Sequence, residues 1–333
     1  MIQIHVIQPE EADQRLDRWF RRRFPQVTQG RLERMLRKGQ LRVDGKRAKS
    51  SLRLAEGQTV RIPPLAEVGE AALPRARQTF HLTDEEAERL RARVLFRDDW
   101  VIALDKPAGL AVQGGSKTSR HLDGMLDALR FDSDERPRLV HRLDRDTAGV
   151  LLLARTAEAA RHLGASFKKN EPRKIYWALV AGTPAKLRGA IDAPLGKERF
   201  GQSEKMTTTA ADARPALTRW MKVASKGREV TWLALRPMTG RTHQLRAHCH
   251  ALGHPILGDG KYGGRRAFPE KLELPKQLFL LAREIALPHP EDGTTLRVQA
   301  PLPPHFHAAF DNLGFDPGDL AAEEAALWLG EKH

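Results

Sequence analysis

The segment that most constrains the fold of this chain is residues 139–155, which read LVHRLDRDTAGVLLLAR. A short apolar stretch leads into a polar loop that holds Asp144, and the chain then enters the apolar run Val150–Ala154. Such a run predicts a buried strand. Gly149, just before the run, can take a positive φ and permits a tight turn out of the loop. The segment therefore predicts a carboxylate that is presented in a loop at the mouth of a sheet.

The charge of Asp144 follows from its neighbours in the sequence. Arg142 and Arg145 flank it, and nearby guanidinium groups favour the ionised form of a carboxyl group. An ionised Asp in such a loop can simply fix the loop through ion pairs, and local sequence alone favours that structural role. Residues further along the chain favour a chemical role instead.

Basic residues are concentrated near the N-terminus. The chain carries a net charge of +14, and residues 13–62 hold fifteen Lys and Arg against five Asp and Glu, a local excess of +10. A basic domain of this density is typical of proteins that bind a polyanion, because each phosphate contact releases condensed counterions. A membrane surface would instead require a basic amphipathic helix with a broad exposed apolar face. The apolar residues here are spaced to face a core, so we expect a nucleic-acid partner.

Length and composition bound the class of protein. With 333 residues the chain is long enough for two domains with real cores. No apolar run approaches the ~20 residues that span a membrane, and residues 1–6 alternate like a strand rather than forming a signal peptide. The single cysteine, Cys249, cannot form an internal disulfide. We therefore expect a cytoplasmic protein without a membrane segment, which acts as a monomer.

The basic N-terminal region predicts a small domain over residues 13–62. Apolar residues at helical spacing predict helices over 13–24 and 29–38, and the Asp-Gly pair within 41–46 predicts a tight hairpin. Residues 57–62 alternate as a further strand. The basic side chains that this pattern turns outward are candidate RNA contacts: Arg15, Arg18, Arg22, Arg31, Arg34 and Lys38.

The rest of the chain predicts a linker, a large domain and a tail. Residues 63–93 form a Pro-containing linker in which Thr83 begins a short capped helix. Residues 94–310 alternate strands with a few helices, which favours an α+β fold with a mainly antiparallel sheet, and 311–333 form a C-terminal tail with a short helix. The predicted strands of the large domain are 94–97, 100–104, 150–154, 175–181 and 229–236.

Several motifs of the large domain resemble one family. Residues 141–149 fit the pattern H-R-L-D-x-x-T-[SA]-G of the RluA-type pseudouridine synthases. The resemblance continues in RKIY at 173–176, in PMTGRTHQLRAH at 237–248 and in GHPILGD at 253–259. It is closest to the RluC-type branch, whose members act on large-subunit ribosomal RNA. The resemblance implies the pseudouridine synthase fold, preceded at 13–62 by an S-four (alpha-L) RNA-binding domain.

The resemblance also implies roles for four residues. Asp144 is the catalytic carboxylate, and Arg241 pairs with it to hold it ionised and oriented. Tyr176 stacks on the target base, and its hydroxyl could relay a proton. Arg142 either fills the gap that a flipped base leaves or pairs with an Asp of its own loop.

The implied reaction is the isomerisation of uridine to pseudouridine. Breaking the N1–C1′ bond and rejoining the base through C5 requires neither redox change nor metal, so we expect no cofactor. A glycosidase would require a second carboxylate, for which Asp146 is the only nearby candidate. A metal site among His243, His248, Cys249, His250 and His254 is disfavoured, because no His-Glu-x-x-His pattern is present.

The expected substrate is large-subunit (23S) ribosomal RNA. Transfer RNA is the first alternative, and a non-catalytic RNA-binding or ribosome-assembly factor is the second. Asp144, Tyr176 and Arg241 are all present, which argues against the non-catalytic alternative. The positions of the target uridines depend on RNA shape rather than on any motif of the protein.

Overall fold

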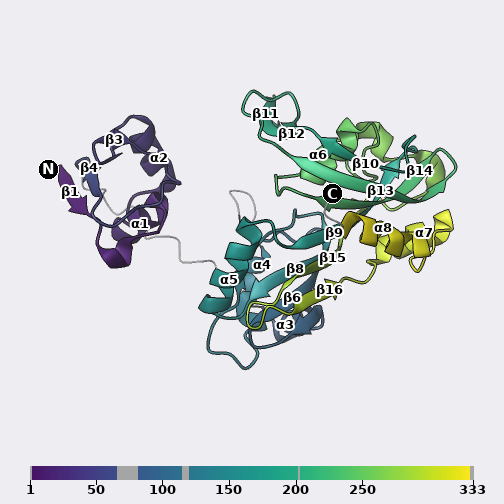
Figure 1. The fold of residues 1–333 in the computed structure, drawn as a ribbon, viewed down its shortest axis with the longest axis horizontal. Coiled ribbons are helices and arrows are strands. Elements are labelled where there is room, and N and C mark those ends of the chain that lie inside the picture. Colours follow the sequence, from purple (N-terminus) through teal and green to yellow (C-terminus); the bar gives the residue numbers. More distant parts are fainter. Residues whose placement is uncertain (1, 66–81, 115–119, 202, 331–333) are drawn as a thin grey trace. The chain divides into compact units, whose positions relative to one another are not determined.

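The computed structural model describes residues 2–65, 82–114, 120–201 and 203–330. The chain divides into two compact units, Met1–Thr79 and Phe80–His333 (Figure 1). Each unit has a hydrophobic core of its own.

The first unit is a four-stranded antiparallel sheet with a helix pair. The strands are in the order β1-β4-β2-β3, and Leu16, Trp19 and Phe20 of the first helix are buried. The turn between β2 and β3 has positive φ at both Asp44 (48°) and Gly45 (72°), as the predicted hairpin requires. The helix pair and the hairpin are therefore confirmed. The elements are β1 (Gln3–Val6), α1 (Leu16–Arg23), α2 (Gln29–Arg37), β2 (Arg42–Val43), β3 (Lys46–Arg47) and β4 (Thr59–Ile62).

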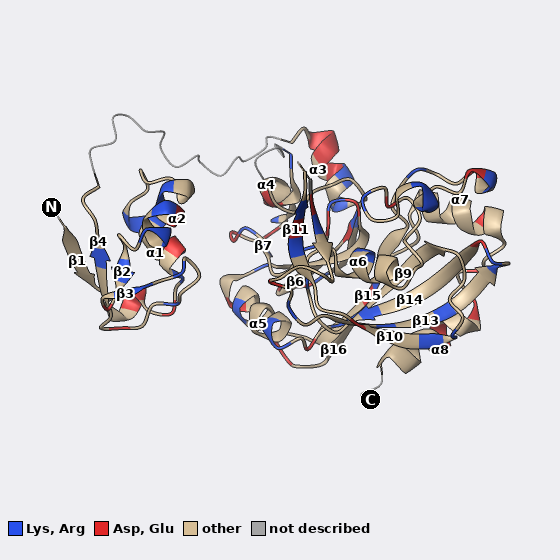
Figure 2. Ribbon diagram, turned by 90° about the horizontal axis from the view of Figure 1, so that it is seen from above, with Lys and Arg blue, Asp and Glu red and all other residues tan. Residues whose placement is uncertain are grey.

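Lys and Arg residues are concentrated along α1 and α2 (Figure 2). Of the six candidate RNA contacts, Arg31 is half-buried and the others are exposed. Arg15 is held by an ion pair of 2.7 Å with the buried Asp17. Their exposure is compatible with RNA binding, which for these residues stays a prediction.

The second unit is built on one large mixed sheet. Its main strand order is β10-β13-β14-β9-β15-β8-β6-β5, with β16 paired to β15 and β7 paired to β8. Only the pairing of β15 with β8 is parallel among the described strands of this sheet. The predicted α+β class with a mainly antiparallel sheet is confirmed. The strands are β5 (Val94–Arg97), β6 (Val101–Lys106), β7 (Arg138–Leu139), β8 (Ala148–Ala154), β9 (Arg173–Ala181), β10 (Arg188–Asp192), β13 (Leu217–Lys226), β14 (Val230–Pro237), β15 (Leu280–Pro288) and β16 (Thr295–Gln299).

Helices and a small hairpin complete the second unit. The strands predicted from sequence all form, and Thr156 caps the helix that follows β8. Within the described ranges, no helix is both long enough and apolar enough to cross a bilayer. The remaining elements are α3 (Asp84–Arg91), α4 (Leu122–Met125), α5 (Ala157–Lys168), β11 (Gly196–Phe200), β12 (Ser203–Thr207), α6 (Gln244–Ala251), α7 (Pro304–Leu313) and α8 (Leu320–Gly330).

The structure corrects the predicted linker. Thr83 does begin α3 with a capping box, as expected. However, Leu90 of α3 is 7% exposed and packs with Ile102 and Leu104 of β6. The C-terminal part of the range 63–93 is therefore part of the large domain, because burying Leu90 holds the helix on the sheet. Residues 66–81 of the predicted linker lie outside the described residues.

The structure also corrects the predicted C-terminal tail. Within 311–330, the buried side chains of Leu313, Phe315, Ala325 and Leu329 belong to the main core of the second unit. Both helices pack on the sheet (Figure 1): α8 contacts β13 and β14, and Phe310 of α7 packs against Trp177 of β9 and Trp232 of β14. This segment is an integral layer of the domain, because its apolar residues cover sheet surface that would otherwise face water.

Candidate active site

Asp144 lies in the loop between β7 and β8, as predicted. Its side chain is 21% exposed and lines a cavity of about 290 Å³ together with Tyr176, His243 and Arg246. The exit from the loop depends on Gly149, whose φ is +110° and whose hypothetical Cβ would lie 2.2 Å from the carbonyl oxygen of Ala282. Only glycine allows β8 to approach β15 so closely at this point.

A buried lysine fixes the Asp144 loop through hydrogen bonds to backbone carbonyl groups. Lys106, at the end of β6, is fully buried and donates to the carbonyl oxygens of Pro107, Leu110 and Arg145 at 2.8–2.9 Å. Burial lowers the pKa of Lys106 to about 8. At neutral pH the ammonium group has three N–H donors, one for each of the three carbonyl oxygens. The hydrogen bond to Arg145 O therefore fixes the backbone directly after Asp144.

The opposite wall of the cavity is the start of α6. His243 occupies the left-handed region with φ 51°, a conformation that is strained for a residue with a Cβ. The buried Gln244 stabilises it: its Oε1 accepts from the Arg241 backbone N–H at 3.1 Å and its Nε2 donates to Leu217 O at 2.9 Å. This amide ties the loop before the helix to β13.

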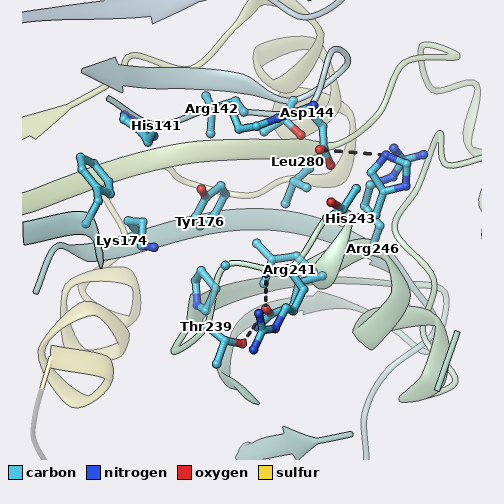
Figure 3. A pocket seen from close by; sticks show the side chains of 18 of the residues that line it. His141, Arg142, Asp144, Lys174, Tyr176, Thr239, Arg241, His243, Arg246 and Leu280 are labelled. Carbon is cyan, nitrogen blue, oxygen red and sulfur yellow. Dashed lines mark hydrogen bonds and ion pairs between the residues drawn. The ribbon is translucent and has the colours of Figure 1, made fainter. Parts of the chain in front are cut away.

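The imidazole ring of His243 faces the Asp144 carboxylate across the cavity. Its Nε2 lies 4.0 Å from the Asp144 carboxylate (Figure 3), and its Nδ1 lies 2.9 Å from the Tyr262 hydroxyl. That hydroxyl already accepts the Met206 backbone N–H, so its own hydrogen is available for Nδ1. In the resulting neutral tautomer His243 carries its hydrogen on Nε2, toward Asp144. Burial lowers the pKa of His243, although the charge of Asp144 acts to raise it.

Arg246 lies in the first turn of α6, close to His243, and is held by a buried ion pair. Its Nε and one terminal nitrogen each donate to an oxygen of Asp259 at 2.7 Å, and the Asp259 side chain is completely buried. Burial lowers the pKa of Arg246, but the hydrogen bonds and charge of Asp259, with a smaller contribution from Asp144, outweigh it and raise the pKa. Arg246 therefore brings a fixed positive charge to the Asp144 side of the cavity.

Removing one partner of this pair should destabilise the domain strongly. We expect Asp259→Asn to lower the free energy of unfolding by about 3–5 kcal/mol, because it leaves a buried guanidinium without its counter-charge. Urea-induced unfolding measures the change. The control is Glu158→Gln, which breaks an exposed ion pair with Arg161 and should leave the unfolding midpoint unchanged. Equal midpoints for Asp259→Asn and the wild type would contradict the assigned role.

The predicted pairing of Arg241 with Asp144 is not formed. Arg241 lines the same cavity, but its Nε donates to Pro215 O at 3.1 Å. The left-handed turn at His243 directs the His243 ring, rather than the preceding arginine, toward the carboxylate. Arg145 also turns away, since its Nε donates to Gly109 O at 3.1 Å. Arg142 is exposed at the mouth of the cavity, and its role stays a prediction.

Tyr176 forms the floor of the cavity. It lies in the centre of the sheet on β9, with Leu235 of β14 on one side and Ala282 of β15 on the other. Burial, and then the charge of Asp144, raise the pKa of Tyr176. The hydroxyl therefore stays protonated at neutral pH, and the ring offers a flat apolar surface beside the carboxylate.

Sequence reasoning missed three cavity residues: His243, Arg246 and Lys174. His243 and Arg246 both lie in the matched segment 237–248, and a spacing of three residues on a helix would have placed them on one face. Their relation to Asp144 could not be read from spacing. Lys174 lines the cavity two residues before Tyr176, and burial lowers its pKa.

Two of the histidines considered as metal ligands have separate partners. His248 Nδ1 lies 2.8 Å from the hydroxyl of the buried Thr218, and His254 Nδ1 lies 2.9 Å from Ala181 O. In the part of the chain that the structure describes, no three His, Cys, Asp or Glu side chains are grouped to hold a metal ion.

Comparison with known proteins identifies the family of the chain. Residues 100–251 match the family model described as RNA pseudouridylate synthase. Ribosomal large subunit pseudouridine synthase C of Escherichia coli K12 is 37% identical over 309 residues, covering 90% of this chain and 93% of the relative. The chain belongs to the RNA pseudouridine synthase family. The protein of the same name from Yersinia pestis is 36% identical over 306 residues, covering 91% of this chain and 92% of that one.

Solved structures of pseudouridine synthases share the fold. Human RNA pseudouridylate synthase domain containing 4 superposes with a TM-score of 0.57 at 25% identity, covering 69% of this chain and 96% of that one. Human RNA pseudouridylate synthase domain containing 1 gives a TM-score of 0.50 at 25% identity and covers 67% of this chain. The pseudouridine synthase fold expected from the sequence motifs is confirmed.

Proposed function

We propose that this protein isomerises uridine to pseudouridine in large-subunit ribosomal RNA, with Asp144 as the catalytic carboxylate. The observation that carries the proposal is the cavity in which Asp144 stands beside the half-buried ring of Tyr176. The names of the relatives, which are ribosomal large subunit pseudouridine synthases, support the choice of RNA.

The reaction requires the base to leave the helix stack, and the cavity suits a flipped base. Tyr176 supplies a stacking surface, and stacking on an aromatic ring compensates for the stacking that the base loses. Asp144 faces the sugar, where its carboxylate can add to the reacting carbon or stabilise the positive charge that develops when the N1–C1′ bond breaks. The base then turns and C5 bonds to C1′, a step that displaces the carboxylate if it has added there, and the C5 proton is released.

The site offers two groups for the proton transfer. The Tyr176 hydroxyl, with its raised pKa, can accept a proton only while it passes its own onward. His243, neutral at pH 7 because burial lowers its pKa, faces Asp144 from the other wall. Arg246 and its partner Asp259 support the electrostatics of Asp144 without contacting its carboxylate in this structure.

The decisive experiment is to map pseudouridine in RNA from a strain that lacks this gene. We expect specific pseudouridines to vanish from large-subunit ribosomal RNA and to return when the wild-type gene is restored. Loss of pseudouridine from transfer RNA instead would establish the alternative substrate. An unchanged pseudouridine map would leave only a non-catalytic role in RNA binding or ribosome assembly.

We further propose that the first unit is an RNA-binding domain of the S-four (alpha-L) type. Its helix pair and hairpin support the proposal, as does its charge excess of +10 over residues 13–62, which suits a phosphate backbone. The exposed candidates for direct contact are Arg18, Arg22, Arg34 and Lys38.

Deleting residues 1–75 should weaken RNA binding and flatten its dependence on salt. Each phosphate contact contributes a log–log slope of roughly 0.9 or less, so several contacts are lost with the basic domain. The remaining chain should still fold, because its core residues belong to the second unit. Fluorescence anisotropy over a salt series measures the slope, and circular dichroism checks the fold. An unchanged slope would show that the basic domain does not contact RNA.

A further inference from the structure

A second cavity meets the Tyr176 cavity at Asp144. The two share Asp144, His243 and Arg246 as lining residues. The second cavity has a volume of about 660 Å³ and is lined elsewhere by the loop after β6, by the Asp144 loop, by residues 258–261 and by residues 276–278. We call it the basic groove, after the side chains of Arg145, Lys261 and Lys276 that line it.

Positive charge exceeds negative charge in the basic groove. Asp259 is already paired with Arg246, and Asp146, which lines the groove with Asp144, lies 3.8 Å from the Arg145 guanidinium. Among the described residues, neither Lys261 nor Lys276 has a carboxylate within ion-pair distance. Burial, and then the charges of Arg246 and Lys205, lower the pKa of Lys261. An anion that enters the groove would relieve this repulsion between cations.

The two lysines are held on segments that pack directly against each other. Gly258 has φ +74°, and a Cβ there would lie 1.6 Å from the carbonyl oxygen of Gln277. Lys261 follows this contact, fixed between the buried Asp259 and Tyr262, and Lys276 precedes it. The spacing of the lysines is therefore set by backbone packing before any ligand arrives, which lowers the entropic cost of binding.

The base and the sugar of the target uridine must lie on different sides of Asp144, because the bond that breaks joins them. If the uracil base occupies the Tyr176 cavity and the carboxylate faces C1′, the sugar and its phosphates must continue away from the base. The basic groove is the cavity that begins at that carboxylate and carries excess positive charge. We propose that the basic groove binds the sugar-phosphate backbone beside the target uridine, with Lys261 and Lys276 contacting phosphates. This inference rests on the proposed function.

The test uses the full-length protein and an in vitro transcript of large-subunit ribosomal RNA. Lys261→Gln and Lys276→Gln should each lower the log–log salt slope of binding by about 0.7–0.9, and the double variant by about twice that. KM for the transcript should rise more than kcat falls. Lys261→Arg and Lys276→Arg keep the charge and should keep most of the slope.

The matched control is Lys226→Gln, an exposed lysine at the end of β13, which pairs with the start of β14. It should leave the slope and KM unchanged. A double variant that keeps the wild-type slope would overturn the proposal. A second result would also overturn it: the double variant binds the bare transcript normally but binds a protein-containing precursor of the large subunit weakly. The groove would then bind a protein rather than the RNA backbone.

Different results would contradict the proposed function and the assignment of the basic groove. Binding measurements require no turnover, so an enzyme that binds the transcript through these lysines but forms no pseudouridine contradicts the proposed function and leaves the groove assignment standing. An active enzyme whose double variant keeps the wild-type slope contradicts the groove assignment alone.

Discussion

Asp144→Asn should abolish pseudouridine formation and leave RNA affinity within a few fold of the wild type. The substitution keeps the shape of the side chain but removes the negative charge, and every role open to the carboxylate at the sugar depends on that charge. Binding is expected to come from phosphate contacts and stacking, which the substitution does not touch. Tritium release from C5, or mass spectrometry after a pseudouridine-specific derivatisation, measures product, and anisotropy measures affinity.

Asp146→Asn is the informative companion to this variant. Asp146 is the second carboxylate of the loop, and its side chain is 54% exposed beside Arg145. A mechanism with one carboxylate predicts that Asp146→Asn retains most of its turnover. Loss of activity in both variants would instead point to the paired carboxylates of a glycosidase-like mechanism. Near wild-type turnover by Asp144→Asn would end the assignment of Asp144.

Two substitutions at Tyr176 should separate stacking from proton transfer. Tyr176→Leu removes the ring, and since stacking contributes ~1–3 kcal/mol per base, it should mainly weaken capture of the flipped uridine. Tyr176→Phe keeps the ring and removes the hydroxyl. If the hydroxyl relays the C5 proton, the Phe variant should lose about two to four orders of magnitude in turnover while binding persists. We expect this loss, and single-turnover kinetics at saturating enzyme measure it.

Normal turnover by Tyr176→Phe would reduce Tyr176 to a stacking surface. The next candidate for the proton transfer would then be His243. His243 lies across the cavity with Nε2 4.0 Å from the Asp144 carboxylate, whereas Arg241 hydrogen-bonds to Pro215 O. His243→Asn would be the next variant, tested for loss of turnover at unchanged RNA affinity.

Local sequence determined the elements that carry the site. The apolar run Val150–Ala154 could only be buried, and it forms most of β8. Gly149 before it takes the positive φ that the turn requires. The Asp-Gly hairpin and the cap at Thr83 were likewise readable, because each depends on the conformational preferences of a few adjacent residues. Asp144 and Tyr176 were found through motifs rather than through geometry.

Only the tertiary structure decided which charged groups meet. Arg241 was expected beside Asp144, but the backbone at His243 enters the left-handed region and brings a different side chain to the carboxylate. Likewise, Lys276 and Lys261 are brought together because Gly258 packs against Gln277. The sequence pattern predicts a C-terminal tail, but the apolar residues of this segment cover the sheet. Sequence patterns encode local conformation and burial, whereas contacts between distant loops depend on backbone directions that are fixed only when the sheet and its helices pack.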